Sequence, residues 1–453
     1  MSELKKRRGV APLWGGIAVL SLAALGGAWA AVAQETVAPI TIVINQSPWF
    51  EGFANVVETY EEESGNQVEL DVNPFAGSLE KQRAAVRGAE SPFDVLIINA
   101  GFFIEMYQGG FLRPLAEIDP SFELDPGVYT FDDSVYWNPE TNRVDPAAGQ
   151  LMTVPINPNI PLLYYRTDLY EELGLEVPET WDELLENAQA IHDPPARYGI
   201  VQRGARGTFD VTYDVLPYLW SHGGDFFRDQ KSGDFTITIN SPESKAGLDT
   251  YLRLAAEAGH PQTAGQSQSN VIQNMLTDKA GHLVVVIAAW AQMDDPNKSA
   301  VVGNVGFAVP PHAPGHDPAP PLGHWLAGIP KNIPEERQKA ALAFLRWFQT
   351  YDAQVAYAEG GAPPVREDVL KSDLAQEERF RWMTALAEAL PYSRLTFTIP
   401  EASEIVAIAE LRLNQAISGE ISSAAALNGM AAEIEAVMQG AGYETARLPD
   451  LPK

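Results

Sequence analysis

Strands that alternate with helices near the N-terminus set the strongest limit on the fold. Apolar runs predict strands at residues 40–44, 68–72 and 93–98. The first gap between them has the i, i+3, i+4, i+7 apolar spacing of a helix that Gly65 ends, and the second gap holds a polar helical stretch, Ser78–Arg87. Because strands separated by helices form parallel sheets, this region predicts an α/β fold.

The length of the chain predicts a second domain. A single hydrophobic core rarely serves 453 residues, so two domains are expected. Residues 153–163 form an extended run broken by three prolines, which indicates a crossing from the first domain into the second. The proline-rich loop 310–321 lies between predicted strands at 305–309 and 325–329, and indicates a second crossing.

The first residues have the pattern of a secretory signal peptide. Four basic residues, Lys5–Arg8, precede an apolar run at 10–32 that is rich in small residues and closes on an A-x-A motif. We expect cleavage after Ala33 and export to the periplasm. A retained membrane anchor is the alternative, because the run is long enough to span a bilayer. The arginine pair leaves twin-arginine export open, but the flanking residues favour the Sec pathway.

Charge and cysteine content restrict the partners. The net formal charge of −29 at pH 7 repels nucleic acid and anionic lipid, so no nucleic-acid partner is expected. The chain has no cysteine, which a secreted protein with a large core tolerates. Without a cysteine after the signal, no lipid can be attached to one. These features predict a freely diffusing periplasmic monomer.

Two long stretches carry a family resemblance. In FDVLIINAGFFIEMYQGGFLRPL (93–115) a strand is followed by a helix that ends in Gly, an apolar residue and P-L. In VPINPNIPLLYYRTDLYEELGLEVPETWDELLENA (154–188) a Tyr-Tyr strand, a short helix, Gly, Pro and T-W-x-E follow one another. The later matches are LPYLWSHGGDFF, SPESKAGLDTYLRL, VGFAVPP, GHWLAGIPKN, AALAFLRWFQTYDAQ and GGAPPVREDVL. In this order the stretches resemble the family 1 extracellular solute-binding proteins of bacterial ABC importers, which include maltose-binding and sorbitol/mannitol-binding proteins.

The resemblance implies a type II periplasmic-binding-protein fold: two α/β lobes, each a mainly parallel sheet flanked by helices, with a ligand cleft between them. It implies lobe 1 at 34–154 plus 318–373 and lobe 2 at 155–317 plus 374–453. It also implies a protein without catalysis, cofactor or metal, which captures a sugar, polyol or short oligosaccharide by lobe closure and delivers it to ABC transporter permease subunits. Asn99 stands where many relatives have a carboxylate, and LTDKAGHLVVVIAAW replaces the usual Gly-Lys-x-Ala-Met pattern, so the substrate does not carry over.

Candidate ligand residues of the first lobe follow its strands. In open α/β sheets the ligand lies beyond the carboxyl ends of the strands. Asn45, Trp49 and Glu51 follow the first predicted strand, and Asn99 and Phe102 follow the third. Aromatic rings stack on the C–H faces of sugars, and planar amides donate and accept hydrogen bonds together. For Trp49 a buried packing role is the alternative.

Candidates in the second lobe come from loops. Asn157 and Asn159 lie in the first crossing, where their amides face the ligand or satisfy hinge backbone groups. Arg203, Arg206 and Asp210 lie in a Gly-rich loop after a predicted strand. An arginine side chain can donate two hydrogen bonds to vicinal hydroxyls, as it does to carboxylates. A solvated loop without ligand contacts is the alternative.

Three further candidates come from the later part of the chain. Trp290 and Trp325 match tryptophans of the resembled family and are the main stacking candidates, while Glu404 near the start of a late helix is a polar candidate. Other tryptophans have the helical spacing of core residues and are not expected in the site. These are Trp181, Trp347 and Trp382.

Two other classes of function compete with transport. A secreted carbohydrate-active enzyme would suit the many carboxylates, but the sequence has no G-x-S-x-G, H-E-x-x-H or G-x-x-x-x-G-K motif and no Cys nucleophile. His312 and His316 are four residues apart, but the Ala-Pro-Gly between them prevents the helix that would place both on one face, so no metal site is expected. A module that presents its ligand to a sensor is the second rival, and the fold does not exclude it.

Overall fold

The computed structural model describes residues 37–207 and 209–452. The expected signal peptide, residues 1–33, and its cleavage site after Ala33 lie outside these residues. Within the described ranges, no helix has both the length and the apolar character needed to cross a bilayer.

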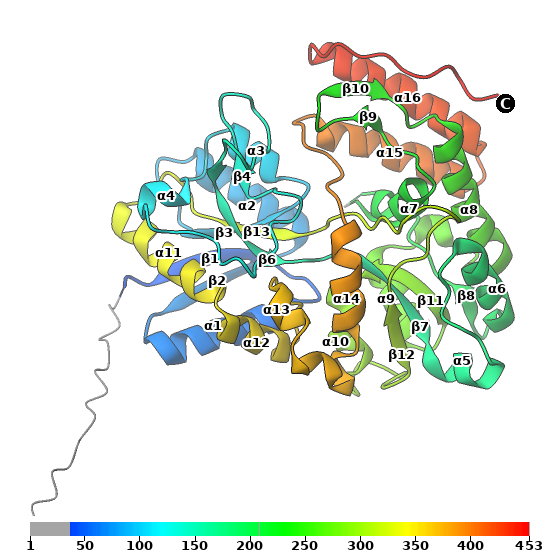
Figure 1. Ribbon diagram of the computed structural model, residues 1–453, viewed down its shortest axis with the longest axis horizontal. Helices are drawn as coiled ribbons and strands as arrows, with labels where there is room; N and C mark the ends of the chain where they lie inside the picture. Colours follow the sequence, from blue (N-terminus) through cyan, green and yellow to red (C-terminus); the bar gives the residue numbers. More distant parts are fainter. Residues whose placement is uncertain (1–36, 208, 453) are drawn as a thin grey trace, which may run out of the picture. The chain divides into compact units, whose positions relative to one another are not determined.

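The first sheet has five strands in the order β2-β1-β3-β13-β6 (Figure 1). They are β1 (Ile40–Asn45), β2 (Val68–Asn73), β3 (Val95–Asn99), β6 (Thr153–Asn157) and β13 (Trp325–Gly328). β1 pairs in parallel with β2 and β3, whereas β13 pairs antiparallel with both β3 and β6. Only β13 is therefore reversed in this sheet, as expected for a mainly parallel α/β lobe.

Helices bury their apolar faces against the first sheet. In α1 (Phe50–Ser64) the predicted residues Phe53, Val56, Val57 and Tyr60 are all buried, and Gly65 ends the helix with a φ of 71°. That left-handed angle favours glycine because it has no Cβ. The other helices and the small hairpin here are α2 (Phe75–Arg87), α3 (Phe103–Gln108), α4 (Leu115–Ile118), β4 (Tyr136–Trp137), β5 (Gln150–Leu151), α11 (Glu335–Phe348), α12 (Tyr351–Glu359) and α13 (Glu367–Leu370).

The second sheet has the order β12-β7-β11-β8. Its strands are β7 (Pro161–Arg166), β8 (Tyr198–Ile200), β11 (Ala280–Val286) and β12 (Val305–Ala308). β7 is antiparallel to β11 and β12, and β11 is parallel to β8, so a single strand is again reversed.

Helices and one hairpin surround the second sheet. They are α5 (Thr167–Leu173), α6 (Trp181–Ile191), α7 (Asp210–Ser221), β9 (Phe227–Asp229), β10 (Asp234–Ile237), α8 (Pro242–Ala258), α9 (Gln268–Leu276), α10 (Trp290–Met293), α14 (Trp382–Ala389), α15 (Ala402–Ile417) and α16 (Ser423–Gly440). Short 3-10 helices are η1 (Thr263–Gly265), η2 (Ile287–Ala289), η3 (Asp373–Gln376), η4 (Glu378–Phe380) and η5 (Leu390–Tyr392). Of the tryptophans expected in the core, Trp181 and Trp382 are buried, and Trp347 is half-buried with its Nε1 donating to Glu63 at 2.8 Å.

The reversed strands are explained by the two crossings between the sheets. β6 ends at Asn157, and only residues 158–160 separate it from β7. The chain therefore enters the second sheet at the edge where β11 ends, as the pairing of Pro161 with Val286 records. β13 likewise begins opposite the end of β3, with Trp325 paired to Asn99. The carboxyl ends of the parallel strands in both sheets consequently lie toward the crossings, where a ligand site is expected.

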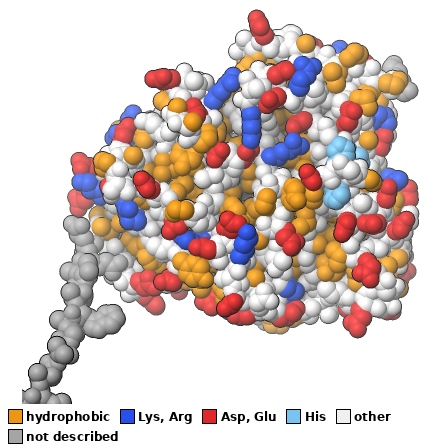
Figure 2. All heavy atoms as spheres, viewed as in Figure 1, with side chains coloured by type: hydrophobic (Ala, Val, Ile, Leu, Met, Phe, Trp, Pro, Cys, Tyr) orange, Lys and Arg blue, Asp and Glu red, His pale blue; other side chains and the backbone are white. Residues whose placement is uncertain are grey.

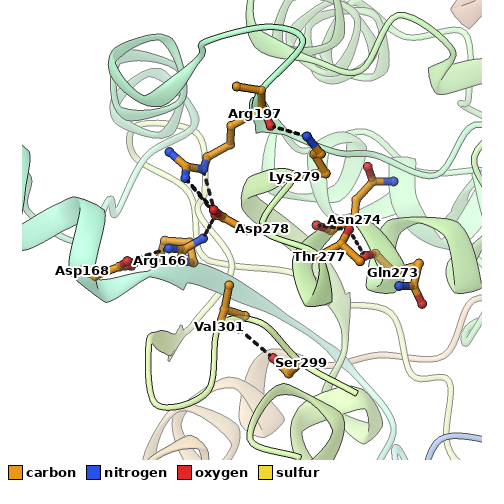
Figure 3. A network of polar contacts seen from close by, with 11 residues as sticks. Arg166, Asp168, Arg197, Gln273, Asn274, Thr277, Asp278, Lys279, Ser299 and Val301 are labelled. Atoms are coloured by element: carbon orange, nitrogen blue, oxygen red, sulfur yellow. Dashed lines mark hydrogen bonds and ion pairs between the residues drawn. The ribbon is translucent and has the colours of Figure 1, made fainter. Parts of the chain in front are cut away.

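A polar network stabilises the opposite edge of the second sheet, where β7 ends and β11 begins (Figure 3). The buried guanidinium of Arg166 donates from Nε to Asp168 at 2.8 Å and also pairs with Asp278. Asp278 accepts from Arg197 Nη2 at 2.8 Å. Asp278 has a φ of 60°, a left-handed conformation that Asp tolerates better than most residues. Because this network lies away from the crossings, we assign it a structural role.

Charged side chains of both signs are scattered among hydrophobic and uncharged atoms on the face in Figure 2. Asp and Glu are spread over that face with Lys and Arg among them, and they do not gather into one acidic patch there.

Candidate ligand-binding site

A cavity of about 290 Å³, the central cavity, lies where the strand ends of the two sheets meet. The strands deliver its walls directly, because β1, β3, β11 and β13 each contribute a residue from the end that faces the crossings. Of the residues predicted from the sequence, those that line it are Asn45, Trp49, Asn99, Asn159, Arg203, Asp210 and Trp325.

Aromatic rings form one wall of the central cavity. Trp49 precedes α1 and Trp325 begins β13, and their ring centroids are 5.6 Å apart. Phe75, the first residue of α2, packs edge-on against Trp325 at 5.9 Å. Both indoles are almost fully buried, at 1% and 6% exposure, and neither Nε1 has a hydrogen-bond acceptor among the described residues. The wall therefore offers apolar faces for C–H groups and two N–H donors.

Buried polar atoms form a second set of contacts. Asn45 Oδ1, Ser47 Oγ and Asn159 Oδ1 are buried and have no hydrogen-bond partner within residues 37–207 and 209–452. All three residues line the central cavity. Since an unsatisfied buried polar group costs about 1–3 kcal/mol, a ligand with hydroxyl groups would recover part of that cost on binding.

A buried arginine lies on the second-sheet side. Arg203 Nε donates to Asp214 Oδ1 at 3.0 Å, and the backbone N–H of Arg203 donates to Asp214 Oδ2 at 2.8 Å. Nη1 donates to Gln268 Oε1 at 3.3 Å and lies 3.8 Å from Asp210 Oδ1. Nη2 is buried and makes no hydrogen bond to any residue of the described part. Asp214 therefore orients the guanidinium, and Nη2 is left without a hydrogen-bond partner among the described residues.

The charge on this side of the central cavity is controlled by Asp214. Burial raises the pKa of Asp214 to about 6, although Arg203 and hydrogen bonds from Arg203 and Tyr251 oppose the rise. At neutral pH the carboxyl is therefore mostly ionised and paired with Arg203. With Asp210 beside them, one guanidinium faces two carboxyl groups.

The raised pKa predicts how stability depends on pH. The pKa of Asp214 is about 6 in the folded protein and near 4 in the unfolded chain, so a proton on this carboxyl stabilises the fold. This contribution to the free energy of unfolding is complete below pH 4 and is lost as pH rises through 6. Relative to Asp214→Asn, the free energy of unfolding of the wild type should fall by about 2 kcal/mol between pH 4 and pH 7. Urea unfolding of both proteins measures this change. Subtracting one free energy from the other cancels the pH dependence that comes from the other carboxyl groups. A difference that is the same at both pH values would contradict the prediction.

Three predicted residues lie next to the central cavity but do not line it. Phe102 packs behind Phe75 at 5.9 Å. Asn157 is fully buried, and its Oδ1 accepts the backbone N–H of Asn159 at 3.0 Å. Glu51 lines a neighbouring cavity of about 350 Å³ and pairs with Lys298 at 3.4 Å. These residues can support the cavity walls.

The other three predicted residues lie outside it. Trp290 stacks on Trp382 of α14 at 4.9 Å, because the η2 turn after β11 carries it into the packing between α10 and α14. Arg206 and Glu404 are exposed and line no part of the central cavity.

Several lining residues were not predicted. Phe75 lies two residues after the end of β2, so the strand-end rule applied to that strand would have identified it. Phe209 and Tyr213 come from the start of α7, and the Tyr213 hydroxyl donates to Leu322 O at 2.7 Å. Residues 267–269 at the start of α9 carry no local signal, because tertiary packing alone brings this turn to the cavity.

The family model and the relatives that match this chain are all solute-binding proteins. The family model described as bacterial extracellular solute-binding protein matches residues 45–355. The mannitol-binding protein of Pseudomonas aeruginosa is 26% identical over 374 residues, which cover 78% of this chain and 81% of that protein. The sn-glycerol-3-phosphate-binding periplasmic protein of Rhizobium meliloti is 33% identical over 246 residues, which cover 52% of each chain.

Solved structures share the fold. Maltose-bound MalE3 of T. maritima has a TM-score of 0.76 and 25% identity, over 88% of this chain and 100% of that chain. An ABC transporter solute-binding protein from Agrobacterium radiobacter in complex with ribitol has a TM-score of 0.75 and 22% identity, over 89% of this chain and 99% of that chain. The two-lobed α/β fold predicted from the sequence is confirmed.

Proposed function

Because this chain belongs to the bacterial extracellular solute-binding protein family, we propose that it captures a neutral monosaccharide or polyol in the central cavity and delivers it to the permease subunits of an ABC importer. The observation that supports this most is the combination of buried tryptophan rings with unpartnered polar atoms on the described walls of that cavity. Sugars and polyols present both C–H groups and hydroxyls, and a site of this composition matches both.

The charges favour a neutral ligand over a phosphate ester. Arg203 is the sole basic residue among the described residues that line the central cavity, and it is paired with Asp214 and close to Asp210. A phosphate group would bring negative charge toward two carboxyl groups in a buried site, where charges are poorly screened. A polyol hydroxyl can instead accept from Arg203 Nη2 and donate to an asparagine oxygen.

The volume favours a small ligand. The central cavity has a volume of about 290 Å³. This is near the lower limit of about 300 Å³ for ligand pockets. One sugar ring or one open-chain hexitol is therefore the proposed ligand.

The wider proposal concerns export and lobe movement. The mature protein would be a periplasmic monomer released after Ala33, without catalytic activity. Its lobes would be 34–154 plus 318–373 and 155–317 plus 374–453, and the short crossing at 158–160 is a suitable hinge. Ligand would favour closure because contacts from both lobes form only in the closed state.

The test is a thermal-unfolding screen of the mature protein, stripped of bound ligand by unfolding and refolding. The panel contains hexitols, pentitols, hexoses, disaccharides, amino acids and sn-glycerol-3-phosphate. A ligand at about a thousand times its Kd should add about 4 kcal/mol to the free energy of unfolding. We expect a rise in Tm with a neutral hexose or polyol, and chromatography should recover that compound unchanged. A shift with sn-glycerol-3-phosphate alone, or conversion of a compound to product, would contradict the proposal.

A further inference from the structure

A second, larger cavity of about 640 Å³ adjoins the central cavity. Residues of α2 and α3 line one side of it, and residues 395–403 before and at the start of α15 line the other. Phe209 and Tyr213 line both cavities, so these two side chains lie between them. The space available to a ligand therefore depends on how firmly the two rings are held.

Phe209 is held in an uncommon backbone conformation. It precedes α7 with a φ of 67° and a ψ of 9°, the left-handed region that a bulky residue rarely adopts. Such a conformation persists only where the surroundings hold it, and it is most common at functional sites. Glu410, buried on α15, holds this loop by accepting the backbone N–H of Gly207 at 2.9 Å. Burial raises the pKa of Glu410, while backbone hydrogen bonds from Gly207 and Phe209 lower it.

The Phe209 ring spans from the second-sheet side to the first. It packs edge-on against Phe102 at 5.9 Å and lies 6.0 Å from the ring of Tyr213. Gly101 gives it room: a Cβ there would lie 2.7 Å from the Cζ atom of Phe209. Contact with a glycine of the opposite lobe means that the ring reaches the far wall and closes the central cavity at this side.

We propose that Phe209 is a partition that restricts the ligand to a single sugar ring or one open-chain polyol. The larger cavity behind it would accommodate a second sugar unit if the ring were absent. This inference rests on the proposed function and adds a size limit to it. Tyr213 frames the partition, because its hydroxyl is fixed to the backbone of Leu322.

The test measures binding of matched ligand pairs by calorimetry: glucose with maltose, and sorbitol with maltitol. For the wild type we expect the smaller member of a pair to bind at least about a hundredfold more tightly than the larger. Phe209→Ala should lower affinity for the smaller ligand by about tenfold and raise affinity for the larger by about tenfold. Phe209→Gly, which relaxes at a positive φ, is the second variant if the alanine variant does not fold.

Phe75→Ala is the matched control, because Phe75 lines the central cavity but not the larger one. It should weaken binding of the smaller ligand without any gain for the larger. The partition is overturned if the wild type binds both members equally, or if neither Phe209 variant gains affinity for the larger ligand while the wild type binds the smaller. If the wild type binds no carbohydrate or polyol of the thermal panel, the proposed function fails as well.

Discussion

Replacing Trp325 with alanine is expected to weaken binding of the neutral ligand by about a hundredfold or more. Loss of a buried aromatic side chain costs about 3 kcal/mol or more, and about 1.4 kcal/mol is a tenfold change in Kd. Trp325 contributes its ring face and the Nε1–H, which has no acceptor within the described ranges. Calorimetry should be carried out below the unfolding midpoint of the variant, since the ring also packs against Trp49 and Phe75.

Two variants separate binding from packing. Trp290→Ala removes the same side chain from a buried position outside the central cavity, so it should lower Tm but leave Kd within about twofold. Trp325→Phe keeps an aromatic face and removes the N–H, so we expect a loss of about tenfold. If Trp290→Ala weakened binding as strongly as Trp325→Ala, the central cavity would be the wrong site.

The sequence predicted the first sheet and the strand ends that line the central cavity well, for a local reason. β1 and β3 are mainly apolar runs, and the residues that end them, Asn45 and Asn99, face the crossing region wherever the rest of the chain lies. The helix pattern of α1 likewise depends on residues three and four apart. Such features need no knowledge of distant parts of the chain.

The wall from the second sheet was harder to predict. Arg203 and Asp210 were predicted as loop residues. Asp214, which accepts the hydrogen bond of the Arg203 guanidinium, lies one turn into α7, and no sequence pattern indicates this pairing. Phe209 resembles an ordinary helix-flanking residue until its left-handed φ and its contact with Gly101 are known. Trp290 shows the converse: a tryptophan matched to the family by position packs here on Trp382.

Removing Asp214 is expected to have the largest effect on stability. Asp214→Ala leaves two buried donors of Arg203, Nε and the backbone N–H, without an acceptor, and each unsatisfied buried donor costs about 1–3 kcal/mol, so a loss of about 2–5 kcal/mol is expected. Urea unfolding at pH 7 measures the change. Ligand affinity should fall as well, because Asp214 fixes the orientation of the guanidinium.

A double variant distinguishes the pair's roles in stability and in binding. Arg203→Met with Asp214→Leu replaces both charges by apolar groups, so no buried charge of the pair is left without its partner and most of the lost stability should return. Binding should nevertheless remain weak, because Nη2 is gone. Recovery of both stability and affinity would show that Arg203 does not contact the ligand, whereas recovery of neither would show that packing around α7, rather than the ion pair, fixes this wall.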